Sequence, residues 1–296
     1  MRSHDKEHLY KHVSLETAYA VLNSGCLRWS SPVQFNDPFD IPEVLYEDFD
    51  PKHLQSVLID RVTKILEGTE DTSSRTLSPG VLLLKKLIAF AEEGMRKEIY
   101  SSFSEIVDST DKLPLVFGEL REFWAVNRKR MRILCLTDRW NSASMWDRYS
   151  SSHTGVVFEL FCDEEIDSSL ITAQEVIYSD EPMKISTVEG FVDYILFDPT
   201  ETMMHMMEQN TLTKTLDWRN EQEFRVVSWK RKIEDEGDYS DYAIHPNEAK
   251  SIILGASMNQ EDQDRLTLIA NLRFPDIEIW KTAKTASRTL EKTRIK

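Results

Sequence analysis

The sequence contains little cysteine and glycine and no long apolar run. Its three cysteines, Cys26, Cys135 and Cys162, are odd in number and widely spaced, so they predict neither a disulfide framework nor a zinc site. No apolar stretch approaches the roughly 18 residues of a membrane span, and the first residues form no apolar signal region. These absences predict a soluble, cytoplasmic protein that has reduced cysteines and no membrane partner.

Positive charge is also in short supply. The 36 lysine and arginine residues face 51 aspartate and glutamate residues, which gives a formal net charge of −15. A generic binder of the nucleic-acid backbone needs a basic face, so this class of protein is disfavoured. The chain is 296 residues long and 41% hydrophobic, with 13 Phe and 7 Trp, which is typical of a globular protein with a substantial core.

The hydrophobic periodicity predicts strands and helices in an irregular order. Short strands are indicated at 8–12, 27–30, 133–137, 155–160, 174–178, 251–255 and 277–280, and helices at 14–25, 53–66, 79–106, 115–130, 142–149, 191–216 and 259–272. We therefore expect a single α+β domain over residues 1–296, with a small mixed or split β-sheet. Residues 51–132 would be a helical insertion, and residues 281–296 a loose basic tail.

The stretch 217–229 carries the most unusual polar pattern. From Phe224 onward it is typical of a strand, and side chains alternate along a strand. Glu221, Glu223 and Arg225 would then share one face, about 7 Å apart from one residue to the next, with Phe224 and Val226 on the other. The polar row is either a functional site or a structural ion cluster on a charged edge strand.

Two other segments offer candidate binding residues. The loop Phe35-Asn36-Asp37-Pro38-Phe39-Asp40 combines anchoring aromatics and proline with three short polar side chains, Asn36, Asp37 and Asp40. The segment 138–155 is rich in polar and aromatic residues, and Trp146 and Tyr149 lie three apart on a predicted short helix. His153 has no metal-ligand spacing around it, so no metal site is predicted. Both segments could also be ordinary structural loops.

Several motifs together resemble a known family. They are Tyr10-Lys11-His12, Leu27-Arg28-Trp29-Ser30-Ser31-Pro32, Phe35-Asn36-Asp37-Pro38-Phe39-Asp40, Leu134-Cys135-Leu136-Thr137, Met145-Trp146-Asp147-Arg148-Tyr149, His153-Thr154-Gly155 and Trp218 with Glu221-Gln222-Glu223-Phe224-Arg225. In this order they resemble the bacterial and phage-associated family called domain of unknown function 2971. The resemblance covers roughly residues 8–256, with His12 in place of an expected Tyr and Thr137 in place of Ser.

A second, weaker resemblance is to ADP-ribosyltransferases. The order of His12 at the end of a strand, Thr137 on a later strand, and then Glu221-x-Glu223 is similar to the order of their motifs. The resemblance implies a split, strand-rich core that binds NAD as a substrate in an extended cleft, and the sequence contains no Gly-x-Gly-x-x-Gly dinucleotide loop.

The resemblance also implies roles for individual residues. Glu223 would hold a ribose hydroxyl and stabilise the positive charge that develops on the sugar, and Glu221 would orient or deprotonate the acceptor. Trp146 or Tyr149 would stack on a ring of NAD, and His12 would bind a ribose. The remaining candidate contacts to NAD are Asn36, Asp37, Asp40, Thr137, His153 and Arg225.

We therefore expect an NAD-processing enzyme, most like an ADP-ribosyltransferase or an NAD glycohydrolase, whose acceptor would be a protein or a nucleic acid. Family resemblance suggests a role in phage defence or as a toxin. Two alternatives stay open. A non-catalytic module could bind a nucleotide or a partner with the same residues, and a nuclease could gather Asp37, Asp40, Glu221 and Glu223 around Mg²⁺.

Overall fold

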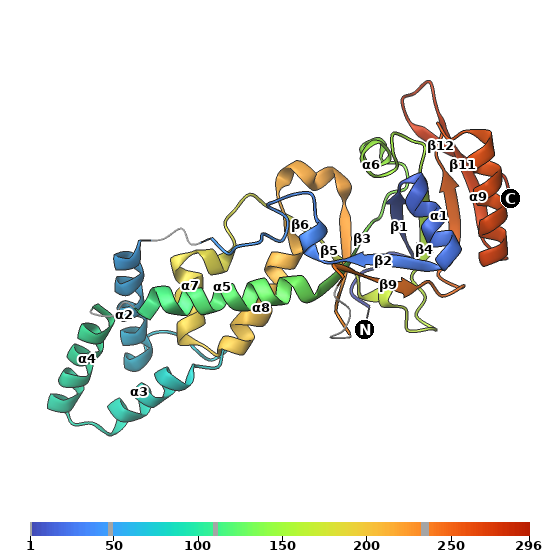
Figure 1. Cartoon of the computed structure of the whole chain (residues 1–296). Helices are drawn as coiled ribbons and strands as arrows, with labels where there is room; N and C mark the ends of the chain where they lie inside the picture. Colours follow the sequence, from blue (N-terminus) through green and yellow to red (C-terminus); the bar gives the residue numbers. More distant parts are fainter. Residues whose placement is uncertain (1, 47–49, 109–111, 232–236) are drawn as a thin grey trace. The chain divides into compact units, whose positions relative to one another are not determined.

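The computed structural model describes residues 2–46, 50–108, 112–231 and 237–296. The chain forms two compact units. Unit 1 consists of Met1–Asp40, Arg128–Ser179 and Leu212–Lys296, and unit 2 consists of Ile41–Asn127 and Asp180–Thr211. The chain therefore passes between the units four times. Helices and strands are both abundant, which confirms the predicted α+β class (Figure 1).

Unit 1 is built on a mixed sheet of ten strands. Strands β12-β11-β10-β4-β1-β3-β2-β9 follow one another, and β8 pairs with β3 and β5. β10 and β11 are parallel, while the other pairs in this sheet are antiparallel. The strands are β1 (His8–Val13), β2 (Cys26–Ser30), β3 (Met131–Thr137), β4 (Val156–Phe161), β5 (Gln174–Glu175), β8 (Glu223–Trp229), β9 (Tyr239–Ala243), β10 (Ala249–Leu254), β11 (Glu278–Lys284) and β12 (Leu290–Arg294). A separate pair joins β6 (Ile177–Tyr178) to β7 (Thr213–Lys214).

The pairing between β1 and β3 is short. β1 pairs along its whole length with β4, and β3 pairs along its whole length with β8. Between β1 and β3, by contrast, the register joins Tyr10 to Thr137. The two strands diverge beyond this position, so side chains rather than backbone hydrogen bonds fill the space between them. The sheet is mixed, as expected, but it is continuous and has more strands than the sequence suggested.

Among its described residues, unit 1 also contains the helices α1 (Leu15–Ser24), α6 (Ala143–Tyr149) and α9 (Gln260–Arg273) and the 3₁₀ turns η1 (Pro32–Gln34), η2 (Ser169–Thr172) and η4 (Leu216–Glu221). Helix α1 begins as predicted, because the Ser14 side chain accepts a hydrogen bond from the backbone N–H of Thr17. It ends at Gly25, whose φ of 70° is the left-handed conformation that glycine adopts without a steric cost.

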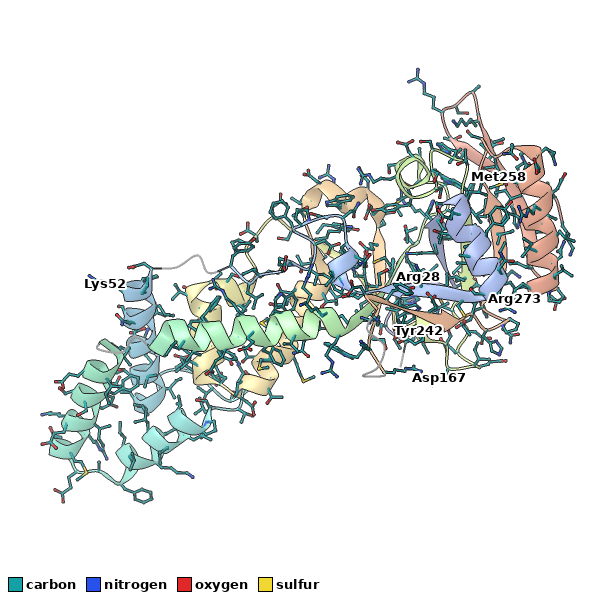
Figure 2. All side chains as sticks on the ribbon, in the orientation of Figure 1. Arg28, Lys52, Asp167, Tyr242, Met258 and Arg273 are labelled. Atoms are coloured by element: carbon teal, nitrogen blue, oxygen red, sulfur yellow. The ribbon has the colours of Figure 1, made fainter. Side chains whose placement is uncertain are left out.

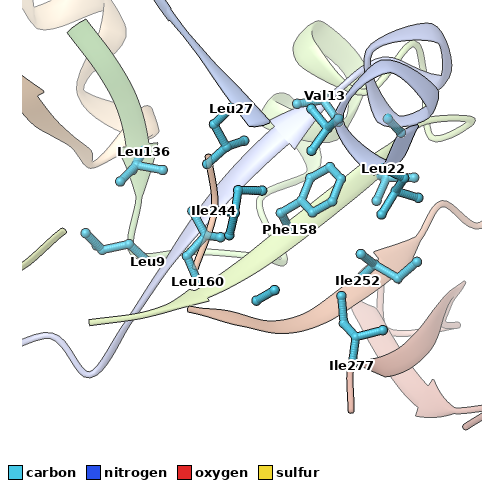
Figure 3. Close-up of a cluster of buried hydrophobic side chains, with 14 of the residues drawn as sticks. Leu9, Val13, Leu22, Leu27, Leu136, Phe158, Leu160, Ile244, Ile252 and Ile277 are labelled. Carbon is cyan, nitrogen blue, oxygen red and sulfur yellow. The ribbon is translucent and has the colours of Figure 1, made fainter. Parts of the chain in front are cut away.

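Apolar side chains pack against both faces of the sheet. On one face, Leu9, Phe158 and Ile252 from three strands meet Leu22 of α1 in the main core (Figure 3). Leu266 of α9 belongs to the same core. On the opposite face, a smaller cluster joins Trp146 of α6 to Val157, Ile253 and Leu290. The alternation of Val157 with Phe158 follows from the period of two along a strand.

Unit 2 is helical in the part of the chain that the structure describes. Its elements are α2 (Pro51–Glu67), α3 (Pro79–Phe90), α4 (Glu93–Asp108), α5 (Lys112–Arg130, whose last three residues belong to unit 1), η3 (Lys184–Ser186), α7 (Val188–Leu196) and α8 (Pro199–Leu212). Among the described residues, none of the helices combines the length and the apolar composition that a membrane crossing requires.

Four of the predicted elements are wrong in their extent. The helix expected at 79–106 is interrupted between Phe90 and Glu93, where Ala91 adopts an extended conformation with φ of −85° and ψ of 142°. The helix expected at 191–216 is two helices, because Pro199 disfavours the helical conformation of the residue before it. The strand expected at 174–178 is divided into β5 and β6, which belong to different sheets.

The fourth is the expected loose tail at 281–296. Most of it forms the β11–β12 hairpin, in which Trp280 pairs with Arg294 and Lys284 with Leu290. Leu290 is buried, while the other side chains of β12 are exposed or half-buried. A strand at the edge of a sheet can be polar along almost its whole length. For that reason its sequence is hard to distinguish from that of a tail.

Gly155, just before β4, allows two backbone segments to approach closely. A Cβ atom at this position would lie 2.2 Å from the carbonyl oxygen of Val13 and 2.9 Å from the Cα of Ser150. We expect Gly155→Ala to lower the free energy of unfolding by about 1–3 kcal/mol, because backbone atoms cannot move aside as side chains can. Denaturant titration measures the loss. Gly118→Ala in α5, with no atom within 4 Å, is the control and should be neutral or slightly stabilising; equal stability of the two variants would contradict the prediction.

Candidate functional site

A cavity of about 310 Å³ lies in unit 1 where β1 and β3 diverge. This volume is at the lower end of the range for small-molecule pockets. The strands contribute Tyr10, Lys11 and His12 from β1, and Cys135 and Leu136 from β3. The other lining residues come from the segment after β2, from α6, and from β7, η4 and β8: Gln34, Phe35, Asn36, Asp40, Met145, Tyr149, Lys214, Glu221 and Glu223.

Arg225 on β8 is the centre of a buried ion cluster. Its Nε donates to Oε1 of Glu223 at 2.8 Å, and its Nη2 donates to Oε2 of Glu223 at 3.0 Å and to Oδ2 of Asp40 at 2.7 Å. The Arg225 side chain is 0% exposed. Phe224 and Val226 lie in the apolar core on the other face. The predicted alternation is therefore confirmed for Glu223 and Arg225, the two charged residues of the predicted row that lie on the strand.

Lys214 joins the three carboxylates of the cluster. Its Nζ lies 2.7 Å from Oε2 of Glu221, 3.1 Å from Oε2 of Glu223 and 3.5 Å from Oδ2 of Asp40. Lys214, the second residue of β7, is 6% exposed, and Trp218 lies beneath its ammonium group at 4.6 Å. One lysine thus holds together side chains that the sequence separates by up to 183 residues (223 − 40).

Glu221 reaches the cluster by a different route from the one expected. It is the last residue of η4 and not a strand residue, because Gln222 adopts a left-handed conformation with φ of 45° and turns the chain into β8. Tyr149 donates its hydroxyl to Oε1 of Glu221 at 2.6 Å. The hydroxyl of buried Thr137 donates to the backbone oxygen of Glu221 at 2.7 Å. Thr137 therefore fixes the position of Glu221, and it does not line the cavity.

The two buried cations stabilise the ionised form of Glu223. Burial alone would raise the pKa of Glu223, but Arg225 and Lys214 outweigh it and lower the pKa to about 2. Burial would likewise lower the pKa of Lys214, but the carboxylates of Glu223, Asp40 and Glu221 raise it. At neutral pH the cluster therefore contains an ionised carboxylate and a protonated lysine.

Asp40 differs from the other two carboxylates. Burial raises its pKa, and Glu223 acts in the same direction, although Arg225 and Lys214 oppose them. Its Oδ1 has no hydrogen-bond partner among the described residues, whereas its Oδ2 binds Arg225. Asp40 is 3% exposed and lines the cavity. A buried acceptor without a partner is costly, so a ligand that donates a hydrogen bond here would be favoured.

His12 lines the cavity as a neutral ring. Its Nε2 lies 3.0 Å from the backbone oxygen of Arg139, and its Nδ1 lies 3.4 Å from Oγ of Ser150. Burial lowers the pKa of His12 to about 4. The ring edge also contacts Trp146. His12 therefore offers no positive charge to a ligand at neutral pH.

Two predicted aromatic contacts are wrong. Trp146 is 0% exposed, and its indole N–H donates to the backbone oxygen of Trp140 at 2.6 Å, so it packs in the core and cannot stack on a ligand. His153 stacks on Trp146 with a centroid distance of 5.9 Å, and it does not line the cavity. Tyr149, the other predicted aromatic, does line it.

The loop residues separate into two groups. Asn36 is exposed and Asp40 buried, and both line the cavity. Asp37 does not line it; its Oδ1 accepts the backbone N–H of Phe39 and holds the turn. A magnesium site made of Asp37, Asp40, Glu221 and Glu223 is not formed, and in the described part of the chain no three His, Cys, Asp or Glu side chains are arranged to hold a metal ion.

Sequence reasoning missed Lys11, Lys214 and Cys135. Lys214 lies in a stretch that was expected to be the end of a long helix, so no local pattern distinguished it. Lys11 stands in an alternating strand pattern like many exposed lysines. Cys135 faces the cavity from β3, and burial raises the pKa of its thiol, which keeps it protonated and a poor nucleophile.

Comparison with known proteins gives one family. The model of the family described as "Protein of unknown function (DUF2971)" matches residues 145–226. This range contains Tyr149, Lys214, Glu221, Glu223 and Arg225, but not the loop with Asp40. No curated protein and no solved structure matches the chain. The match over residues 145–226 confirms, for this part of the chain, the resemblance to the DUF2971 family that the sequence motifs indicated.

Proposed function

We propose that unit 1 binds NAD in this cavity and breaks the bond between nicotinamide and ribose. The observation that carries the proposal is a small-molecule cavity whose wall contains three buried carboxylates, Asp40, Glu221 and Glu223. Buried charges at the wall of a cavity act more strongly on a ligand than charges in water do. A reaction that consumes NAD would suit a toxin or an effector in phage defence.

The proposed reaction develops positive charge at the sugar. When the bond between C1′ of the ribose and N1 of nicotinamide breaks, N1 keeps the electron pair and leaves as neutral nicotinamide. C1′ becomes cationic until water or an acceptor adds its oxygen or nitrogen there and loses a proton. A fixed negative charge beside C1′ lowers this barrier.

The carboxylates would have different roles. Glu223 is held ionised by Arg225 and would supply the negative charge. Glu221 would accept the proton from water or from the acceptor, and the hydroxyl of Tyr149 would orient it. Phe35 and Tyr149 are aromatic residues on the wall and would contact a ring of the ligand.

Nicotinamide release from NAD by the purified protein tests the proposal. We expect Glu221→Gln and Glu223→Gln each to lower the rate by about 10²-fold or more, because each removes one acid–base or electrostatic contribution. Addition of a cell lysate as a source of acceptors would raise the rate for a transferase and leave it unchanged for a glycohydrolase. Asp241→Asn, at an exposed carboxylate of β9, is the control and should keep the parent rate.

Buried variants can unfold, so Tyr149→Phe provides a milder test. It removes one hydrogen bond to Glu221 and keeps the ring. Its rate should fall while its thermal unfolding temperature stays close to that of the parent. No release of nicotinamide by the folded parent, with or without lysate, would refute the enzymatic proposal.

One observation favours a second candidate, a module that binds a nucleotide without reacting. Both oxygens of Glu223 already accept hydrogen bonds from Arg225, and one also binds Lys214. Because these cations already balance its negative charge, Glu223 would stabilise a developing positive charge less strongly, and its main role would be to shape the cavity. Tight nucleotide binding by the folded protein without turnover would support this candidate.

A further inference from the structure

Lys11 lies on the cavity wall without a carboxylate partner among the described residues. Its Nζ donates to the backbone oxygen of Cys135 at 2.7 Å, across the gap between β1 and β3. In the described part of the chain, no carboxylate lies within ion-pair distance of it. Lys214, the other lysine on the wall, contacts three carboxylates. Lys11 therefore retains two N–H donors and an uncompensated charge for a ligand.

Asp40 presents the opposite chemistry on the same wall. Its unpartnered Oδ1 is a buried acceptor, and its carboxyl group contacts Arg225 and Lys214 through Oδ2. A chain of contacts connects Lys11 to Asp40. The Lys11 ammonium binds the backbone carbonyl of Cys135 on β3, and Cys135 is the partner of Arg225 in the pairing of β3 with β8. The Arg225 side chain in turn binds Asp40. The cavity thus has a basic position, Lys11, and an acidic position, Asp40, and the paired strands β3 and β8 hold both in place.

We propose that Lys11 binds a phosphate group of the ligand and that Asp40 accepts a hydrogen bond from a hydroxyl of the ligand's sugar. The ligand class is then a ribose phosphate, and the inference rests on the proposed function in taking NAD as the full ligand. A lysine ammonium binds phosphate as a point charge, and an uncompensated one favours it more than a paired one. His12 is neutral and adds no competing charge.

Adenosine and AMP test the phosphate contact, because they differ by one phosphate and contain no nicotinamide that could be released. Isothermal titration should show that the parent binds AMP about tenfold or more tightly than adenosine, the scale of one charge-assisted contact. Lys11→Met, which removes the charge and keeps most of the length of the side chain, should abolish this difference. Lys250→Met, at an exposed lysine of β10 outside the cavity, should preserve it.

AMP and its 2′,3′-dideoxy analogue test the sugar contact. Loss of both hydroxyls should weaken binding to the parent about tenfold, and the effect should be smaller in Asp40→Asn, because an amide oxygen accepts more weakly than a carboxylate. Thermal unfolding of each variant checks that the site is intact.

The outcomes separate this inference from the proposed reaction. Equal affinities of the parent for adenosine and AMP, absence of binding, or a preference that survives in Lys11→Met would overturn the assignment of Lys11. If removal of the sugar hydroxyls did not weaken binding to the parent, the assignment of Asp40 would be overturned. A phosphate preference that depends on Lys11, together with no nicotinamide release, would support the inference and refute the reaction.

Discussion

Replacement of Arg225 by methionine should lower the free energy of unfolding by about 3–5 kcal/mol, the typical cost of removing one partner from a buried ion pair. Methionine fills much of the space of the arginine, so the loss comes from charge and not from a cavity. Glu223 and Asp40 would keep Lys214 as their remaining cation, 3.1 and 3.5 Å away. Denaturant titration followed by circular dichroism measures the change.

The exposed pair between Arg28 and Asp241 provides the matched control. Arg28, labelled in Figure 2, has Nε 3.1 Å from Oδ1 of Asp241, and the two side chains are 52% and 44% exposed. Water screens such a pair, so Arg28→Met should cost less than about 1 kcal/mol. If Arg225→Met were no more destabilising than Arg28→Met, the cluster would not be the structural centre that we describe.

Acidification should destabilise the folded protein in two separate pH windows. The folded-state pKa of His12 is about 4, below its ordinary value of 6.5, because burial disfavours the charged ring. A group with a depressed folded pKa gives stability that is complete above its ordinary pKa and is lost as the pH falls through the folded value. His12 should therefore cost on the order of 3 kcal/mol between pH 6.5 and 4.

Protonation of Glu223 should reduce stability in a lower pH window, from pH 4.5 down to about 2. Its folded-state pKa is lowered because Arg225 and Lys214 outweigh the effect of burial. Asp40 opposes it in part, because its folded pKa is raised and it takes up a proton more readily in the folded state. The groups that face His12 are Lys11 on its own strand and, from other segments, the Arg139 carbonyl, the Ser150 hydroxyl and Trp146.

His12→Gln is the variant that separates the two windows. It should remove the loss between pH 6.5 and 4 and leave the loss below 4.5 in place. Unfolding free energies at half-unit pH steps measure both. If the free energy of unfolding changed with pH equally in parent and variant between pH 6.5 and 4, His12 would not titrate as described.

Local periodicity predicted the parts of the site that depend on local geometry. The alternation along β8 placed Glu223 and Arg225 together because a strand has a period of two. Asp40 was a candidate because short polar side chains in a proline-rich loop bind neighbouring groups. Glu221 was misplaced on the strand, since no sequence pattern shows that Gln222 takes a positive φ.

The rest of the site depends on contacts between distant segments. Lys214 is recognisable as a site residue only once β7 stands beside the cluster, because a single lysine in an ordinary sequence has no pattern. Trp146 was expected to face a ligand because its neighbours in the sequence are polar. The strands and the β11–β12 hairpin instead bury it, through Ile253 and Leu290, which lie more than 100 residues along the chain.

During synthesis, β1 must wait for its partner strands, because they lie more than 100 residues later in the chain. β1 ends at Val13, and its partner strands begin at Met131 in β3 and Val156 in β4. At a translation rate of about 5–20 residues per second, β1 emerges roughly 6–24 s before the first of these partners is made. Throughout that interval both of its hydrogen-bonding edges are unsatisfied. The nascent β1 segment is therefore a natural target for a chaperone, and the sheet of unit 1 can form only after the later strands have left the ribosome.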